Sequence, residues 1–434
     1  MSRVAPLRYL GRSRLVAVGI NSVIGGGIFI LPMTVTALVG AAGLPAYLVA
    51  GTVVFGVGLA LASLAARHEA SGGPYVYVQS VFGRFAGFQV GWLFCLARLT
   101  AMATLMNGFA RYVGALVPWG THAVARAALV LICAMAVVGT NVAGIRATSQ
   151  AANLLAILKV APLLLLGLSG LFFVRLERFA LAPFRPSDFL RAVLLLIFAF
   201  TGFEILTVPA EESLRPRRDM PFALIATIGS VCVLYLLVHT AALGMLPGLG
   251  SETAPLATAA GILAGPAGRY GMTAVAAVSM AGCTLVSLVG ASRLLYAMSR
   301  AAQIPAVLGA LAPRRRTPVV ASFLLSGIAA ALAIAGGYAE LAAVSAGSRM
   351  LIYLACCLAC LVPARGLAPG GVAPGVAPPR GRIAASLTAV AILILLSGLE
   401  RREVAAGLMG IAFGMALYLG ARRRTVPAFD GEVP

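Results

Sequence analysis

The chain has 434 residues, of which 61% are hydrophobic and only 11% are charged, and its mean hydropathy is +0.99. A soluble globular protein carries roughly a quarter of its residues as charged groups, so the composition excludes a water-soluble body. The formal net charge of +20 could suit a nucleic-acid-binding protein, but the basic residues form short clusters between apolar runs. No nucleic acid partner is therefore expected, and residues 1–434 are predicted to form one all-α integral membrane domain.

Apolar runs long enough to cross a bilayer, about 20 residues each, recur along the whole chain and predict about twelve transmembrane helices. In chain order the predicted spans are 14–39, 44–66, 84–115, 123–142, 153–174, 189–212, 220–245, 266–300, 318–336, 340–362, 383–399 and 403–421. Residues 363–382, rich in Pro, Gly and Ala, predict a flexible cytoplasmic loop before the last two spans.

The arginines predict which side of the membrane the chain ends occupy. The first residues carry Arg3, Arg8, Arg12 and Arg14, and the last predicted span is followed by Arg422, Arg423 and Arg424. The even-numbered loops are also rich in arginine, whereas the opposite side holds fewer, chiefly in the connection 175–191. Because basic residues are retained in the cytoplasm, both termini are predicted to be cytoplasmic in a multi-pass protein of the cell membrane.

Two predicted spans are interrupted at corresponding positions. Gly25, Gly26 and Gly27 break the first span, and Thr201-Gly202 breaks the sixth, just before Glu204. Breaks at matching positions of two five-helix halves indicate an inverted-repeat transporter with a binding site near the bilayer midplane. An unwound turn frees amides that attract a carboxylate and carbonyls that accept hydrogen bonds from an ammonium group, so it suits a zwitterion. The alternative is that the glycines serve only close helix packing.

Charged residues inside a membrane are costly and are usually functional. The predicted spans contain Arg98, Lys159, Glu204, Arg293 and Arg349. Lys159 is the single lysine of the chain and Glu204 the single acid predicted near the midplane. A lysine in a dry environment can release its proton and so couple substrate movement to a proton gradient. The alternative is a structural role for Lys159 and Arg98, paired with Glu204 or with carbonyls at helix ends.

Several segments resemble the signatures of the amino acid–polyamine–organocation (APC) permeases. They occur in the family's order and spacing: Gly19 to Phe29 with Leu31-Pro32; Ser71 to Tyr77 with Phe82-Gly83; Phe198 to Glu204 continuing to Ala210-Glu211-Glu212-Ser213; Pro216 to Pro221; and Arg293 to Arg300. The resemblance covers nearly the whole chain.

This resemblance implies the LeuT-type fold, in which five plus five inverted helices are followed by two peripheral ones. The first repeat would span about 14–174, the second about 189–362, and the peripheral helices about 383–421. Matching positions imply a substrate site formed by Ser22, Val23, Gly25, Gly26, Gly27, Phe198, Ala199, Thr201 and Gly202. Phe198 would close over the substrate as a gate. Lys159 falls where some proton-coupled relatives place a lysine, which favours protons over sodium for coupling.

Arg98 departs from the family pattern and bears on the substrate. If Arg98 faces the pocket, a substrate with an anionic or polar side chain is indicated. If Arg98 pairs with Glu204, a substrate with a neutral side chain is indicated. The expectation is a proton-coupled symporter that imports neutral L-amino acids by alternating access, and the alternative is an exchanger of amino acids or amines. Neither an enzyme nor a bound cofactor or metal is expected, because the chain lacks a nucleophile–base–acid set and a metal-ligand cluster. Membrane lipid is the other expected partner, and a homodimer stays open.

Overall fold

The computed structural model describes residues 11–65, 73–116, 119–120, 122–143, 145–207, 215–300, 303–312, 317–362 and 379–423. Within these ranges every regular element is a helix. Arg3, Arg8, the segment Ala210 to Ser213, and 363–378 of the predicted cytoplasmic loop lie outside the described residues. The expected all-α class is therefore confirmed for the part of the chain that the structure describes.

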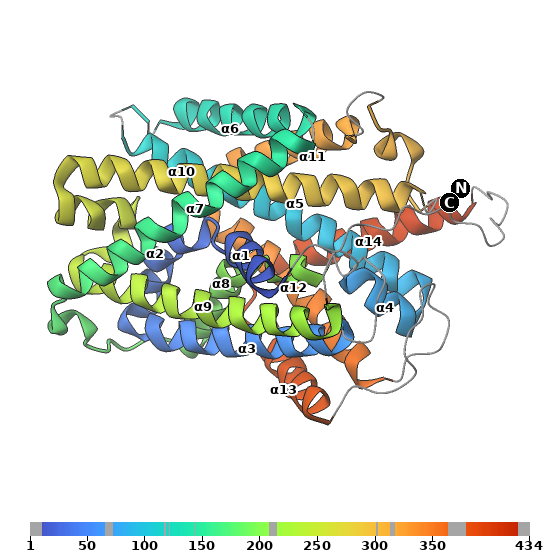
Figure 1. The fold of residues 1–434 in the computed structure, drawn as a ribbon, viewed down its shortest axis with the longest axis horizontal. Coiled ribbons are helices and arrows are strands. Elements are labelled where there is room, and N and C mark those ends of the chain that lie inside the picture. The colour runs from blue at the N-terminus through green and yellow to red at the C-terminus, as the bar shows by residue number, and fades with distance from the viewer. Residues whose placement is uncertain are drawn as a thin grey trace.

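The main helices are arranged as one elongated bundle (Figure 1). They are α1 (Arg12–Val23), α2 (Gly27–Val39), α3 (Gly43–Ala65), α4 (Pro74–Phe82), α5 (Arg84–Gly114), α6 (Ala123–Ala143), α7 (Ile145–Gly170), α8 (Pro186–Phe200), α9 (Pro216–Met245), α10 (Pro255–Arg300), α11 (Val319–Ala335), α12 (Tyr338–Leu361), α13 (Pro379–Leu396) and α14 (Arg401–Arg423). Short 3-10 turns join them, among them η4 (Phe203–Thr207), which follows α8.

Seven helical stretches in the described ranges are long and apolar enough to cross a membrane, and three shorter apolar helices accompany them. Side chains on α6, α13 and α14 support a membrane location, because large apolar residues such as Leu131, Leu387 and Phe413 are exposed. A soluble monomer rarely exposes so much contiguous apolar surface. The chain is thus a multi-pass membrane protein, while the count of twelve spans and the five-plus-five repeat stay predictions.

Both predicted interruptions occur as broken helices. The first predicted span is two helices, because α1 ends at Val23 and α2 begins at Gly27. Glycine has a low helix propensity, so three in succession leave little to hold the helix together between the two halves. The sixth span ends as an α-helix at Phe200, where Thr201 is extended and Gly202 has φ of 115°. That φ lies in the region that only glycine adopts without strain.

The broken helices lie at the centre of the bundle. In Figure 1, α1, α2, α8 and α12 occupy the middle, α5, α10 and α11 lie on one side, and α3, α9 and α13 lie on the other. The contacts agree with this view, since α5 packs on α10, α11 and α12, and α3 packs on α8, α9 and α13. Helix α10 is kinked at Ala264 and Gly265, so its long arm begins at Pro266. The predicted start of the eighth span at residue 266 coincides with this kink.

Candidate functional site

The two helix breaks contact each other and form one wall of a cavity. A Cβ at Gly202 would collide with the Ser22 carbonyl oxygen, and one at Gly27 would lie 2.6 Å from Ala199 Cα. No side chain larger than hydrogen fits at either contact without a shift. The Tyr235 hydroxyl on α9 lies 3.2 Å from the Val23 oxygen and 2.9 Å from the Ala199 oxygen, so it bridges the two breaks.

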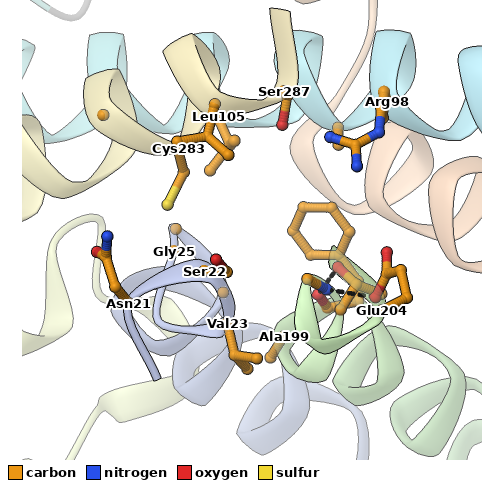
Figure 2. Close-up of a pocket in the computed structure, with 18 of the residues that line it drawn as sticks. Asn21, Ser22, Val23, Gly25, Arg98, Leu105, Ala199, Glu204, Cys283 and Ser287 are labelled. Atoms are coloured by element: carbon orange, nitrogen blue, oxygen red, sulfur yellow. Dashed lines mark hydrogen bonds between the residues drawn. The ribbon is translucent and has the colours of Figure 1, made fainter. Parts of the chain in front are cut away.

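The cavity has a volume of about 60 Å³, several times the roughly 10–15 Å³ that one water needs on the same measure. All twelve residues predicted for the site lie on its lining: Ser22, Val23, Gly25, Gly26, Gly27, Arg98, Lys159, Phe198, Ala199, Thr201, Gly202 and Glu204. Figure 2 shows the breaks along one wall and side chains of α5 and α10, including Arg98, Cys283 and Ser287, along the opposite wall.

At the first break, backbone groups of both polarities are available. The first amides of α2 follow Gly26 and have no partner within the helix, as at any helix N-terminus, and the positive end of the helix dipole lies there. The last carbonyls of α1 are held by a cation from another helix. Lys159 Nζ on α7 donates to the Asn21 and Ile24 oxygens at 2.6 Å each. A positive charge is favourable at this helix C-terminus.

At the second break, Glu204 holds the chain through its carboxylate. Gly202 N–H donates to Glu204 Oε2 at 2.8 Å, and Arg349 Nε on α12 donates to Oε1 at 3.2 Å. The Tyr353 hydroxyl donates to Oε2 at 3.2 Å. Glu204 is only 1% exposed, so its charge is compensated by the Arg349 ion pair and by these hydrogen bonds.

Arg98 makes neither of the structural pairings considered from the sequence, with Glu204 or with carbonyls at helix ends. Its guanidinium lies 4.9 Å from the centre of the Phe94 ring, and the close-up shows it pointing into the cavity (Figure 2). Among the described residues none accepts a hydrogen bond from it, and the ion pair with Glu204 is made by Arg349 instead. Arg98 therefore faces the pocket.

Phe198 lies at the cavity edge with its ring against another aromatic residue. Its ring meets the Tyr338 ring of α12 edge to face, with 6.4 Å between ring centres. Thr201 Oγ1 donates to the Phe198 carbonyl at 2.7 Å, which fixes the end of α8. The aromatic gate expected from the resemblance thus has a ring partner on a separate helix.

The structure adds residues that the sequence did not assign to the site. The sequence places Arg349 as a charge inside a predicted span but does not predict its pairing with Glu204. The available signal was that several basic residues in the spans share a single acid as a possible partner. Tyr235, Cys283 and Ser287 gave no signal, because a lone hydroxyl or thiol in an apolar run is typical of a residue that only packs between helices. Arg293, also predicted inside a span, is exposed near the end of α10.

Comparison with known proteins gives the family. The sequence profile of the amino acid permeases matches residues 10–399, nearly the whole chain. The chain belongs to the amino acid permease family. The permease is 31% identical over 332 residues to an uncharacterized transporter of Mycobacterium tuberculosis, covering 75% of this chain and 73% of the relative. The resemblance to APC permeases is thereby confirmed, and the family is one of transporters.

Two relatives with named substrates are more distant. The permease is 26% identical over 348 residues to the branched-chain amino acid permease of Bacillus subtilis, covering 75% of this chain and 74% of the relative. It is 28% identical over 346 residues to the gamma-aminobutyric acid permease of Escherichia coli, covering 74% and 71%. The names of these relatives differ in substrate, so amino acid transport is supported while the side chain that this permease accepts is not fixed by similarity.

Proposed function

We propose that this permease imports L-amino acids across the cytoplasmic membrane by alternating access, as a proton-coupled symporter with both termini in the cytoplasm. The observation that carries the proposal is the cavity between the two helix breaks, with a buried lysine attached to one of them. Transport by the five-plus-five repeat, in which one set of helices rocks against the other, is part of the same proposal.

The backbone around the cavity suits both ends of an amino acid zwitterion. The α-carboxylate binds the amides of Gly25, Gly26 and Gly27, where the dipole of α2 is positive. The ammonium group binds carbonyls at the end of α8, those of Phe198, Ala199 and Thr201. The Ala199 oxygen accepts a hydrogen bond from the Tyr235 hydroxyl and has a second lone pair for the substrate. The Phe198 oxygen already accepts two hydrogen bonds from Thr201, one from its N–H and one from Oγ1, so the substrate ammonium shares this acceptor with Thr201. Ser22 and Val23 bracket the same group from α1, and Phe198 closes the cavity.

Lys159 couples the cavity to the proton gradient. Its ammonium bonds two carbonyls at the end of α1 and lies 3.8 Å from Cys283 Sγ on α10. Loss of the proton removes the positive charge from the helix C-terminus and weakens both carbonyl contacts. The half-helix α1 is then free to change its position relative to α7, so that protonation and the state of the first break are linked.

The neutral side chain expected from the sequence depended on an ion pair between Arg98 and Glu204. Glu204 is bonded to Arg349 instead, so that support for a neutral substrate is lost.

The proposal is tested with purified protein in lipid vesicles, with labelled amino acids outside and a pH gradient across the membrane. Symport predicts accumulation inside empty vesicles that requires the gradient and ends when a protonophore is added. The alternative of an exchanger predicts uptake only when the vesicles contain an amino acid or amine. Absence of uptake under both conditions, from protein that melts cooperatively, would contradict the proposal.

A further inference from the structure

Arg98 is a buried cation that the fold holds in position on the cavity wall. It lies in the middle of α5 and is 8% exposed. The neighbouring helix α10 makes room for it with a glycine, because a Cβ at Gly290 would collide with Arg98 Nη1. The Phe94 ring lies on α5 one turn earlier, 4.9 Å from the guanidinium carbon. The guanidinium is therefore confined by packing while its donors stay directed toward the cavity.

The charges lining the cavity do not balance without a further anion. Of the described residues on the lining, Lys159, Arg98 and Arg349 are basic and Glu204 alone is acidic. Glu204 attracts Arg98 through space and Arg349 repels it, but both Glu204 oxygens already accept hydrogen bonds from other groups. Lys159 is held by carbonyls. Arg98 is left with the least compensation, and an uncompensated cation in a membrane interior is costly.

We propose that Arg98 binds the side-chain carboxylate of the transported molecule, so that the substrate is an acidic amino acid. This inference rests on the function proposed above. In Figure 2, Arg98 lies across the cavity from Gly25, with Ser287 beside it on the same wall. When the α-carboxylate lies on the amides of the first break, a side chain that crosses the cavity reaches Arg98 and the Ser287 hydroxyl.

The chemistry of the guanidinium favours a carboxylate over other side chains. Its planar fork can donate two parallel hydrogen bonds to one carboxylate, and such charge-assisted pairs are stronger than neutral ones. A neutral amino acid would close the cavity over a guanidinium that has no directly bonded anion, whereas an acidic one supplies that counter-ion. The small cavity of about 60 Å³ favours aspartate over the longer glutamate.

The test is a binding panel read by thermal melting of the purified protein. Wild type, Arg98→Gln and Arg111→Gln are melted with aspartate, glutamate, asparagine, alanine and leucine. Arg111 is the matched control, because it is a half-buried arginine on the same helix that does not line the cavity. A ligand that binds the native state raises the melting temperature according to its concentration over Kd.

Aspartate is expected to stabilise the wild-type protein most. The Arg98→Gln variant is expected to bind aspartate about tenfold or more weakly than wild type, while its affinity for asparagine is kept or improved. Arg111→Gln should behave as wild type. If Arg98→Gln lowered the affinities for alanine and for aspartate equally, Arg98 would bind the α-carboxylate that both share, and the inference would be overturned. Stabilisation by neutral amino acids alone would overturn it and leave the proposed function standing.

No stabilisation by any amino acid, from protein that melts cooperatively, would contradict both proposals. If Arg98→Gln does not fold, Arg98→Lys keeps the charge without the planar fork, and it is expected to bind aspartate with intermediate affinity. The wild-type panel decides between acidic and neutral substrates in either case.

Discussion

The backbone groups freed at the two helix breaks are bonded by side chains of opposite charge. At the first break the freed carbonyls of α1 are bonded by the Lys159 ammonium. At the second, the amide of Gly202 is bonded by the Glu204 carboxylate. Each unwound turn leaves backbone groups without helical partners, and buried groups of that kind must be satisfied. One break therefore uses a cation and the other an anion, according to which backbone group points inward.

The two charges come from different places relative to the breaks that they contact. Lys159 lies on α7, so the cation that bonds the first break comes from another helix. Glu204 lies two residues beyond Gly202 in the same segment and is tied to α12 by Arg349. We infer that the first break responds to protonation while the second anchors the cavity.

The largest effect is expected for Arg349→Ala, which leaves the Glu204 carboxylate buried without its cation. Removing one partner of a buried ion pair costs about 3–5 kcal/mol of unfolding free energy, so the melting temperature should fall sharply. The double variant Glu204→Gln with Arg349→Gln should recover much of the loss, because no buried charge is left over. A melting temperature unchanged by Arg349→Ala would show that the second break does not depend on the pair.

A smaller loss is expected for Gly202→Ala, which tests the contact between the two breaks. The φ of 115° strains any residue with a Cβ, at a cost of about 1–3 kcal/mol, and the methyl group would collide with the Ser22 oxygen. The control is Gly139→Ala on α6, where no atom lies within 4 Å of the added Cβ. Equal melting temperatures of the two variants would contradict the close contact of the breaks.

Lys159→Ala is expected to separate binding from coupling. At one proton per substrate a gradient of one pH unit supports roughly tenfold accumulation, and the variant should lose this accumulation in vesicles. Substrate binding measured by thermal melting should survive, since Lys159 bonds α1 carbonyls rather than the amides of α2. Gradient-dependent uptake by the folded variant would shift the coupling role to Glu204.

The smallest effect is expected for Arg12→Ala, outside both breaks. Arg12 Nε lies 2.7 Å from Asp219 Oδ1; the arginine side chain is 39% exposed and the aspartate side chain 6% exposed. Water reaches the arginine side of this pair, and Asp219 lies in the first turn of α9, where the helix dipole favours a negative charge. The melting temperature should therefore fall less than for Arg349→Ala, and the contribution of the pair should decrease at high salt. A loss as large as that of Arg349→Ala would mean that burial does not explain the ranking.

The sequence predicted the parts of this molecule that depend on local chemistry. The helix-breaking glycines at 25–27 and at 202 act within a few residues, so both interruptions could be predicted from the order of amino acids alone, while the site residues around them were predicted from the resemblance to the APC permeases. Pairings across the bundle could not be assigned in this way. Glu204 and Arg349 are 145 residues apart, and no periodicity in either helix reveals that they meet or that Arg98 is left facing the cavity. The Tyr235 bridge between the breaks is hidden for the same reason.

The proposed binding of an amino acid to the amides at the start of α2 can be tested with the variant Gly25→Ala. An added Cβ there lies 3.4 Å from Cys283 Sγ, close enough to occupy the ligand's place yet without a backbone collision. Affinity for the amino acid that best stabilises wild type is measured by melting at rising ligand concentration, with Gly139→Ala as the control. We expect a cooperatively folded Gly25→Ala variant whose affinity for this amino acid falls by about tenfold or more. Wild-type affinity in that variant would contradict the proposed binding.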